Sequence, residues 1–337
     1  MMRWPKRGRG LAEGVRLAAF GHALPDRVVP NAAIEAELGL APGWIERRTG
    51  FTARRIAAAD QATSDLAIQA GEAALGGQDP AGVGFLILAT STPDRLLPPT
   101  APSVAHRLGL ACAAVDLAGA CAGFLQALPL AAAQVRASGQ EVLVIAANLL
   151  SRRVDPMDAG GRAIFADGAG AVLLAPSPDR AEGIVAADLG SDGAAADLIA
   201  IPAGGSRRPY GPDLSPADTR MQMPDGARVF QAAVERLAQS GKVALDRAGL
   251  SPQDLAGWAP HQANERIVRA AAERLGLAQV PRIGGLEPYG NTSAATIPTA
   301  LSLAAARGAL PRGPILMQAF GAGALWASIV WRHGTGK

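Results

Sequence analysis

Lysine, cysteine and aromatic residues are all scarce in this chain of 337 residues. Its two cysteines are too few for a disulfide scaffold and favour a reducing compartment such as the cytoplasm. Aromatic residues make up 4% of the chain, too few for a surface on which nucleic-acid bases stack. No uninterrupted apolar run reaches about 18 residues. We therefore expect neither a nucleic-acid partner nor a membrane span.

Lysine occurs at three positions only, so 29 of the 32 cationic residues are arginine. Codon bias in a GC-rich genome is the simplest explanation. The functional alternative is a surface that meets phosphates or an acidic protein. Residues 1–14 carry several of these charges, but Arg16 interrupts the apolar stretch that a signal peptide would need. We interpret residues 1–14 as a tail and expect a cytoplasmic protein.

Short β-branched runs alternate with alanine-rich stretches of helical periodicity, which predicts an α/β layered fold with much parallel sheet. The expected strands are residues 83–89, 141–147, 170–174 and 314–319. The expected helices are residues 64–75, 121–137, 227–248, 264–275 and 294–306.

A proline-rich break at residues 175–179 divides the chain into halves, 1–178 and 179–337. Each half contains a glycine-rich turn that leads into a strand, at residues 167–171 and 321–325, which suggests a duplicated unit. Residues 190–223 are rich in Gly, Pro and Ser, and predict an irregular excursion of the kind that often forms a binding loop or lid.

Cys121 lies where a short strand ends, small residues turn and a helix begins. The positive end of the helix dipole lowers the pKa of a thiol placed there, which favours a nucleophile. The alternative is a buried small hydrophobic residue, the usual state of a free cysteine. Cys112 has no helix start after it, and we expect it to be structural.

His261 and Asn291 are two further candidates. His261 follows an apolar segment and Pro260 at a strand-to-helix junction, a position that faces the ligand crevice of α/β sheets. It would otherwise hold a turn. Asn291 precedes a helix, where it would cap the helix, although Thr292 or Ser293 would also serve as the cap.

The glycine-rich segment 321–323 can bring backbone N–H groups close to a ligand, as an oxyanion hole requires. Two cysteines and four histidines, widely spaced, offer no zinc-site pattern, so no metal is expected. A Cys-His-Asn peptidase uses the same residue types, but its flanking segments and fold differ from those expected here.

Three segments considered together are informative: residues 120–124, 260–267 and 290–295. Cys121 and His261 are 140 residues apart, and His261 and Asn291 are 30 apart. These segments resemble the signatures of the β-ketoacyl-acyl carrier protein synthase III family. Further likeness lies at residues 24–31, 44–50, 54–57 and 165–171, and in all it covers roughly residues 15–332. The resemblance implies the thiolase fold, two similar halves in five α-β-α-β-α layers, as a homodimer.

The resemblance also implies a decarboxylative Claisen condensation. Cys121 would take an acyl group from acyl-CoA or another thioester, and the amides of Cys121 and Ala322 would form an oxyanion hole. His261 and Asn291 would stabilise the enolate of malonyl-acyl carrier protein as CO₂ leaves. Acyl-CoA and the phosphopantetheine of the carrier act as substrates, and no cofactor is bound permanently.

Further roles follow from the same resemblance. Trp44, Arg48 and Asn264 would bind CoA or pantetheine, while Leu97, acting across the dimer, and Phe320 would line the acyl pocket. An acidic carrier protein would dock on Arg266, Arg269 and Arg274, which share one expected helix.

The chain departs from the family pattern at a few positions. Ala159 stands where an arginine that covers the CoA adenine is expected, so Arg152, Arg153 or Arg162 would have to substitute for it. Leu97 occupies a position that is often Phe and would admit a larger or branched starter. These departures leave open the acyl donor and the choice between primary and specialised metabolism. Two alternatives also remain: acyl transfer to a hydroxyl or amine without decarboxylation, and a non-catalytic partner subunit.

Overall fold

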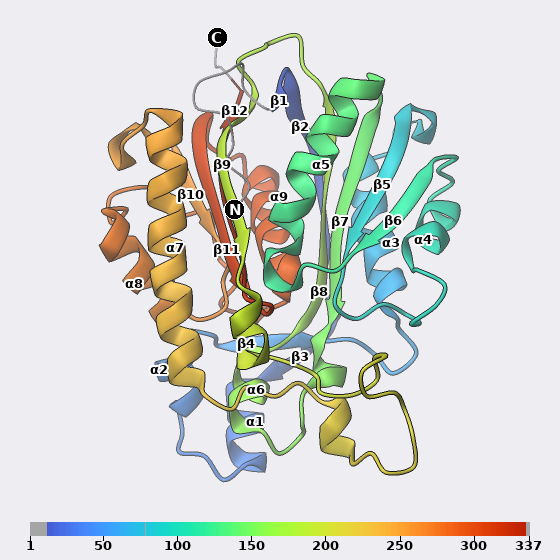
Figure 1. Cartoon of the computed structure of the whole chain (residues 1–337), viewed down its shortest axis with the longest axis vertical. Coiled ribbons are helices and arrows are strands. Elements are labelled where there is room, and N and C mark those ends of the chain that lie inside the picture. Colours follow the sequence, from blue (N-terminus) through green and yellow to red (C-terminus); the bar gives the residue numbers. More distant parts are fainter. Residues whose placement is uncertain (1–11, 78, 335–337) are drawn as a thin grey trace.

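The computed structural model describes residues 12–77 and 79–334 and contains two five-stranded sheets (Figure 1). The first sheet has the order β2 (Val15–Ala23), β8 (Asp167–Pro176), β7 (Glu141–Leu149), β5 (Val83–Ala89) and β6 (Ala113–Leu117). The second has the order β1 (Ala12–Glu13), β9 (Gly183–Ser191), β12 (Leu325–His333), β11 (Gly313–Gly321) and β10 (Gly257–Pro260).

Helices form three layers around these sheets (Figure 1). Helices α5 (Gly123–Ser138) and α9 (Thr296–Ala306) lie between the sheets. Helices α3 (Thr63–Leu75) and α4 (Ala101–Arg107) cover the outer face of the first sheet, and α7 (Gly226–Ala248) and α8 (Glu265–Leu275) that of the second. The five-layered α-β-α-β-α arrangement that the resemblance implies is confirmed.

The two sheets repeat one topology. The order β2-β8-β7-β5 in the first corresponds to β9-β12-β11-β10 in the second, with two antiparallel pairs followed by a parallel pair in each. One short segment crosses over, since β1 at the start of the chain pairs with β9. The internal repeat supports a duplicated unit, and the boundary at residue 178 stays a prediction.

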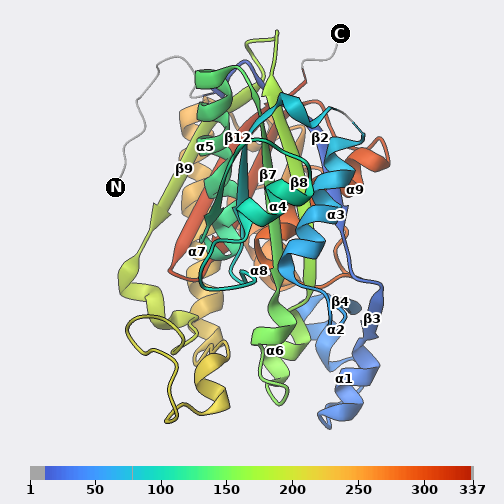
Figure 2. The same cartoon turned by 90° about the vertical axis from the view of Figure 1, so that its right-hand side faces the viewer.

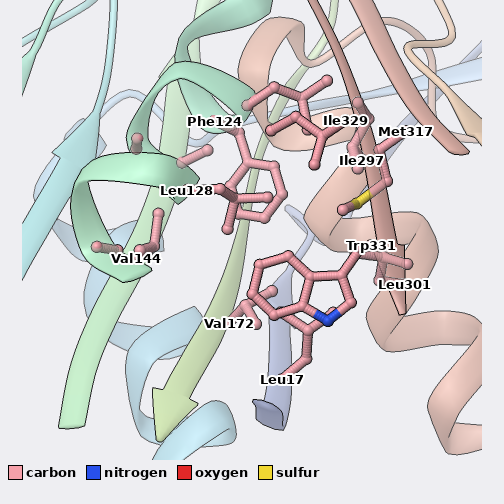
Figure 3. Close-up of a cluster of buried hydrophobic side chains, with 14 of the residues drawn as sticks. Leu17, Phe124, Leu128, Val144, Val172, Ile297, Leu301, Met317, Ile329 and Trp331 are labelled. Atoms are coloured by element: carbon pink, nitrogen blue, oxygen red, sulfur yellow. The ribbon is translucent and has the colours of Figure 1, made fainter. Parts of the chain in front are cut away.

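The main core lies in the central layer (Figure 3). Phe124 and Leu128 of α5, Leu301 of α9 and Trp331 of β12 are all buried there. The buried face of α5 consists mostly of alanine and leucine, whereas that of α9 mixes aliphatic residues with Thr296, Thr299 and Ser302. By contrast, α7 is amphipathic; Asp225 caps its first turn by accepting a hydrogen bond from the Arg228 N–H (2.9 Å).

A smaller cap closes one end of the molecule (Figure 2). It comprises the antiparallel pair β3 (Arg27–Pro30) and β4 (Ala53–Ile56) and the short helices α1 (Asn31–Glu37), α2 (Trp44–Thr49) and α6 (Ala159–Ile164). Ile34, Ile45 and Ala163 pack together as its buried core.

All nine elements expected from the sequence are found within a few residues of their predicted ends. The excursion is irregular as predicted, with two short 3-10 helices, Gly193–Leu198 and Pro216–Thr219. One prediction is wrong: residues 167–171 form the start of β8 rather than a turn. Gly170 belongs there because a Cβ would lie 2.5 Å from the Thr299 nitrogen of α9.

The prediction of an N-terminal tail applies mainly to residues 1–11, which lie outside the described residues. It is wrong for Ala12–Glu13, which form β1 and pair with Ile184 and Gly183 of β9.

Candidate active site

Cys121 lies in the 3-10 turn Ala120–Ala122, between β6 and α5. Ala120 before it has a φ of 44°, a left-handed conformation that costs a non-glycine residue on the order of 1–3 kcal/mol. Gly321, where β11 ends, makes a close approach to it. A Cβ on Gly321 would lie 2.7 Å from the Cys121 nitrogen. The strained turn and the glycine together bring the ends of the two halves against the thiol.

Burial raises the pKa of the Cys121 thiol, and a hydrogen bond from Ser293 Oγ to Sγ (3.3 Å) acts in the opposite direction. The expectation that a helix N-terminus lowers this pKa is therefore not met, because desolvation outweighs the stabilisation of a thiolate. The residue keeps partial exposure and lines two cavities. Cys112, also partly buried, packs against the core of the first sheet, as expected for a structural residue.

His261 follows the end of β10, where its N–H donates to the Gln318 carbonyl (2.7 Å). The imidazole is buried, and Nδ1 lies 2.6 Å from Thr296 Oγ1 at the start of α9. Nε2 has no partner among the described residues. Burial lowers the pKa of His261 to about 4, so the ring is neutral near pH 7.

Asn291 is buried and lines one cavity together with Cys121 and His261. Its main chain forms an isolated β-bridge with Phe165. Its Oδ1 accepts a hydrogen bond from the Ser293 N–H (2.7 Å). The side chain therefore stabilises the turn ahead of α9, the local role that competed with catalysis in the sequence. With Oδ1 occupied, the amide NH₂ is the group left to bind a substrate oxygen.

Two cavities meet at Cys121. The larger, of about 430 Å³, is lined by His261, Asn291, Phe320 and Gly321, and its lining extends to Asn264 and Arg266 at the start of α8. The smaller, of about 130 Å³, extends from Cys121 past Ser293 and Ala322 to Arg153. Phe320, predicted for the acyl pocket, belongs to the larger cavity.

The sequence analysis missed three residues of the smaller cavity: Ser91, Arg153 and Ser293. Ser293 carried a signal, since it lies within the same segment as Asn291. Arg153 was considered only as a substitute for a missing CoA contact. Within the part of the chain that the structure describes, the Arg153 guanidinium donates to no protein group.

The predicted CoA-binding residues form two groups. The Arg48 guanidinium carbon lies 4.2 Å from the centroid of the Trp44 ring, so these two stack on each other in the cap. Asn264 lines the larger cavity and caps α8, its Oδ1 accepting from the Arg266 N–H (2.9 Å).

Neither Arg152 nor Arg162 is free to replace the arginine missing at Ala159. Arg152 Nη2 donates to three carbonyls of residues 58–61. Arg162 forms an ion pair with Glu37 (2.6 Å). Ala159 itself begins α6, behind the Asp158 cap. Of the three arginines considered as substitutes, Arg153 is the one whose guanidinium has no protein partner among the described residues.

The three arginines predicted to dock the carrier protein, Arg266, Arg269 and Arg274, are all exposed on α8. Arg266 also lies over the Phe230 ring, 5.5 Å from its centroid, at the edge of the larger cavity. Leu97 is 82% exposed and lines neither cavity at Cys121 within this chain.

Across residues 12–77 and 79–334, no group of three or more His, Cys, Asp or Glu side chains is arranged to hold a metal ion. Over the same residues, no helix has the length and apolar character needed to cross a membrane.

A cysteine between two topologically similar halves, with a buried histidine and asparagine facing it, defines a thiolase-fold acyltransferase. Family models described as 3-oxoacyl-[acyl-carrier-protein (ACP)] synthase III and its C-terminal part match residues 115–193 and 245–333. The chain belongs to the 3-oxoacyl-ACP synthase III family, and it is an enzyme of this type.

Individual relatives agree with this assignment. The chain is 51% identical to a 3-oxopimeloyl-[acyl-carrier-protein] synthase of Rhodothermus marinus, over 95% of this chain and 94% of that protein. It is 48% identical to the protein of the same name from Brucella abortus, over 91% and 95%. Among solved structures, β-ketoacyl-[acyl carrier protein] synthase III of Thermus thermophilus matches with a TM-score of 0.87 and 39% identity, over 95% of this chain and all of that one.

Proposed function

We propose that this enzyme condenses malonyl-ACP with a starter acyl group that ends in a carboxylate. The observation that carries the proposal is Arg153, an unpaired guanidinium in the small cavity that begins at Cys121. Arg153 is half-buried, and a substrate carboxylate would give its guanidinium a charge-assisted hydrogen bond at that end of the cavity.

The relatives support the same substrate class. The product named for the Rhodothermus and Brucella proteins is 3-oxopimeloyl-ACP, a derivative of a seven-carbon diacid. Decarboxylative condensation with malonyl-ACP adds two carbons, so the matching starter is glutaryl, a five-carbon diacid bound through one end. Its free carboxylate would meet Arg153, with the hydroxyls of Ser91 and Ser293 along the way.

In the first half-reaction, Cys121 attacks the starter thioester and the CoA or carrier thiol leaves. The amides of Cys121 and Ala322 stabilise the tetrahedral oxyanion. Because burial keeps the resting thiol protonated, its proton is lost during attack and is taken up by the departing CoA or carrier thiolate. Ser293 Oγ donates a hydrogen bond to Sγ (3.3 Å), which stabilises the negative charge that develops there.

In the second half-reaction, malonyl-ACP occupies the larger cavity and loses CO₂. When Nδ1 of His261 accepts a hydrogen bond from the Thr296 hydroxyl, the ring carries its proton on Nε2. This Nε2–H would then donate to the malonyl thioester oxygen. The Asn291 amide is a second neutral donor to the enolate oxygen. The carbanion carbon of this enolate then attacks the acyl group on Cys121. These two donors favour condensation over transfer to a hydroxyl or amine, which needs no enolate.

Carrier binding and assembly follow from the surface. Arg266, Arg269 and Arg274 would dock the acidic ACP beside the larger cavity. Strand β6 is an edge of its sheet, and Val115 on it is 43% exposed. Pairing of β6 with a second copy would cover this edge and form a homodimer, bringing Leu97 toward the partner's acyl pocket. We place the reaction in the cytoplasm.

The test is acylation of Cys121, followed by intact-protein mass spectrometry with glutaryl-CoA and valeryl-CoA, which have the same carbon count. Wild type should prefer glutaryl-CoA. In Arg153→Ala that preference should fall at least about tenfold, since a bond to a charged group contributes on the order of 1.5–3 kcal/mol. Release of CO₂ from malonyl-ACP, measured in the same mixture, separates condensation from simple acyl transfer.

Cys112→Ala is the matched control and should acquire the same mass as wild type, whereas Cys121→Ala should acquire none. Equal rates with both CoA esters in wild type, or an unchanged preference in Arg153→Ala, would contradict the assignment of a carboxylate-bearing starter.

A further inference from the structure

The excursion predicted at residues 190–223 lies almost entirely in the connection between β9 and α7, and it forms one wall of the small cavity. Figure 1 shows it in yellow-green to yellow, at the same end of the molecule as α6. Four of its residues line that cavity: Ile199, Ala200, Ile201 and Met221. This segment therefore borders the space in which we propose that the starter lies.

The excursion is hydrogen-bonded to the segment that carries Arg153. Arg220 Nη1 donates to the Arg152 carbonyl (2.8 Å) and the Val154 carbonyl (3.3 Å). The Met221 N–H donates to the carbonyl of Arg153 itself (2.6 Å). Three consecutive carbonyls thus accept hydrogen bonds from two neighbouring residues of the excursion.

The segment with Arg153 has little regular structure of its own. It is the four-residue 3-10 helix Leu150–Arg153, followed by irregular chain before α6. On its N-terminal side, the buried carboxylate of Asp167 accepts from both the N–H and the hydroxyl of Ser151 (2.9 and 2.7 Å). On its C-terminal side, Arg220 and Met221 make the corresponding contacts.

The excursion is also held by hydrogen bonds between its own residues. Ala200 and Gln222 exchange two backbone hydrogen bonds (3.1 and 2.8 Å). Asp218 accepts from Arg208 and from the N–H and hydroxyl of Ser215. Because the excursion is held by its own hydrogen bonds, its contacts with residues 152–154 fix the position of Arg153.

We propose that Arg220 is a positioning residue that sets the length of the starter. This inference rests on the proposed function. Arg220 fixes the distance between the Arg153 guanidinium and Cys121, and this distance decides which diacid reaches from the thioester to the cation. Arg220 itself contacts no reacting atom; it acts through the backbone on either side of Arg153.

The experiment measures acylation of Cys121 by succinyl-, glutaryl- and adipyl-CoA, which differ by one methylene each, in wild type and Arg220→Ala. Wild type should favour one length. In Arg220→Ala the ratio between the favoured length and its neighbours should fall about tenfold, because the position of Arg153 broadens. Arg220→Lys retains a cationic donor and should restore part of the selectivity.

Arg207→Ala is the matched control, an exposed arginine of the same excursion, and should keep the wild-type profile. Equal slowing of all three esters in Arg220→Ala, with the length ratio unchanged, would reduce Arg220 to a structural role and overturn the inference. Failure of the proposed function is a separate result: Arg153→Ala would then leave the preference for glutaryl-CoA over valeryl-CoA unchanged.

Discussion

Replacing His261 by glutamine should remove a pH-dependent part of the free energy of unfolding. Burial lowers the pKa of His261 from 6.5 to about 4 in the folded chain. Between pH 7 and pH 5 the unfolded chain binds a proton that the folded chain does not, so stability falls as the pH falls. Linkage gives a loss of about 2 kcal/mol over that interval, approaching about 3 kcal/mol below pH 4.

Two measurements check this value. Urea unfolding of wild type and His261→Gln at pH 7 and pH 5 should show a pH-dependent loss that is about 2 kcal/mol smaller in the variant. Comparing the change with pH cancels any constant cost of the substitution. NMR of ¹³C-labelled imidazole should also show one resonance, absent from His261→Gln, that does not titrate between pH 8 and pH 5.

The same protonation state matters for catalysis. In the proposed mechanism, a neutral ring whose Nδ1 accepts a hydrogen bond from Thr296 would present Nε2–H to the malonyl thioester. A His261 resonance that titrates near 6.5 in the folded enzyme, with equal pH dependence of unfolding in the two proteins, would refute this reasoning. The ring would then be charged in part at working pH, and a neutral donor would no longer describe it.

Three further outcomes are expected. Gly321→Ala should slow acylation of Cys121 about 100-fold, because its Cβ would lie 2.7 Å from the Cys121 nitrogen and displace an oxyanion donor; rapid mass gain would argue against this. Arg266→Glu should raise the KM for malonyl-ACP about tenfold at low salt and less at high salt, and a salt-independent KM would exclude this docking surface. Asp167→Ala should lower the free energy of unfolding by about 3 kcal/mol in urea titrations, since three donors lose a buried acceptor; a change below about 1 kcal/mol would contradict that.

Local patterns were enough to predict most of the regular structure. The nine expected strands and helices exist because hydrophobic periodicity and cap residues act over a few residues and need no distant partner. The errors arose where long-range pairing decides the outcome. Residues 167–171 look like a turn because of their glycines, yet they form a strand because they pair with β2 on one side and β7 on the other.

Local sequence was enough to single out Cys121, His261 and Asn291 as candidates, because each lies in a distinctive segment. Only the tertiary structure decided their electrostatics, because desolvation raises the pKa of the thiol and lowers that of the imidazole once the halves enclose them. It also decided the place of Arg153, which lies beside Cys121 through contacts with residues nearly 70 positions away along the chain. No local pattern carries that information, because burial and the meeting of distant segments are properties of the folded chain.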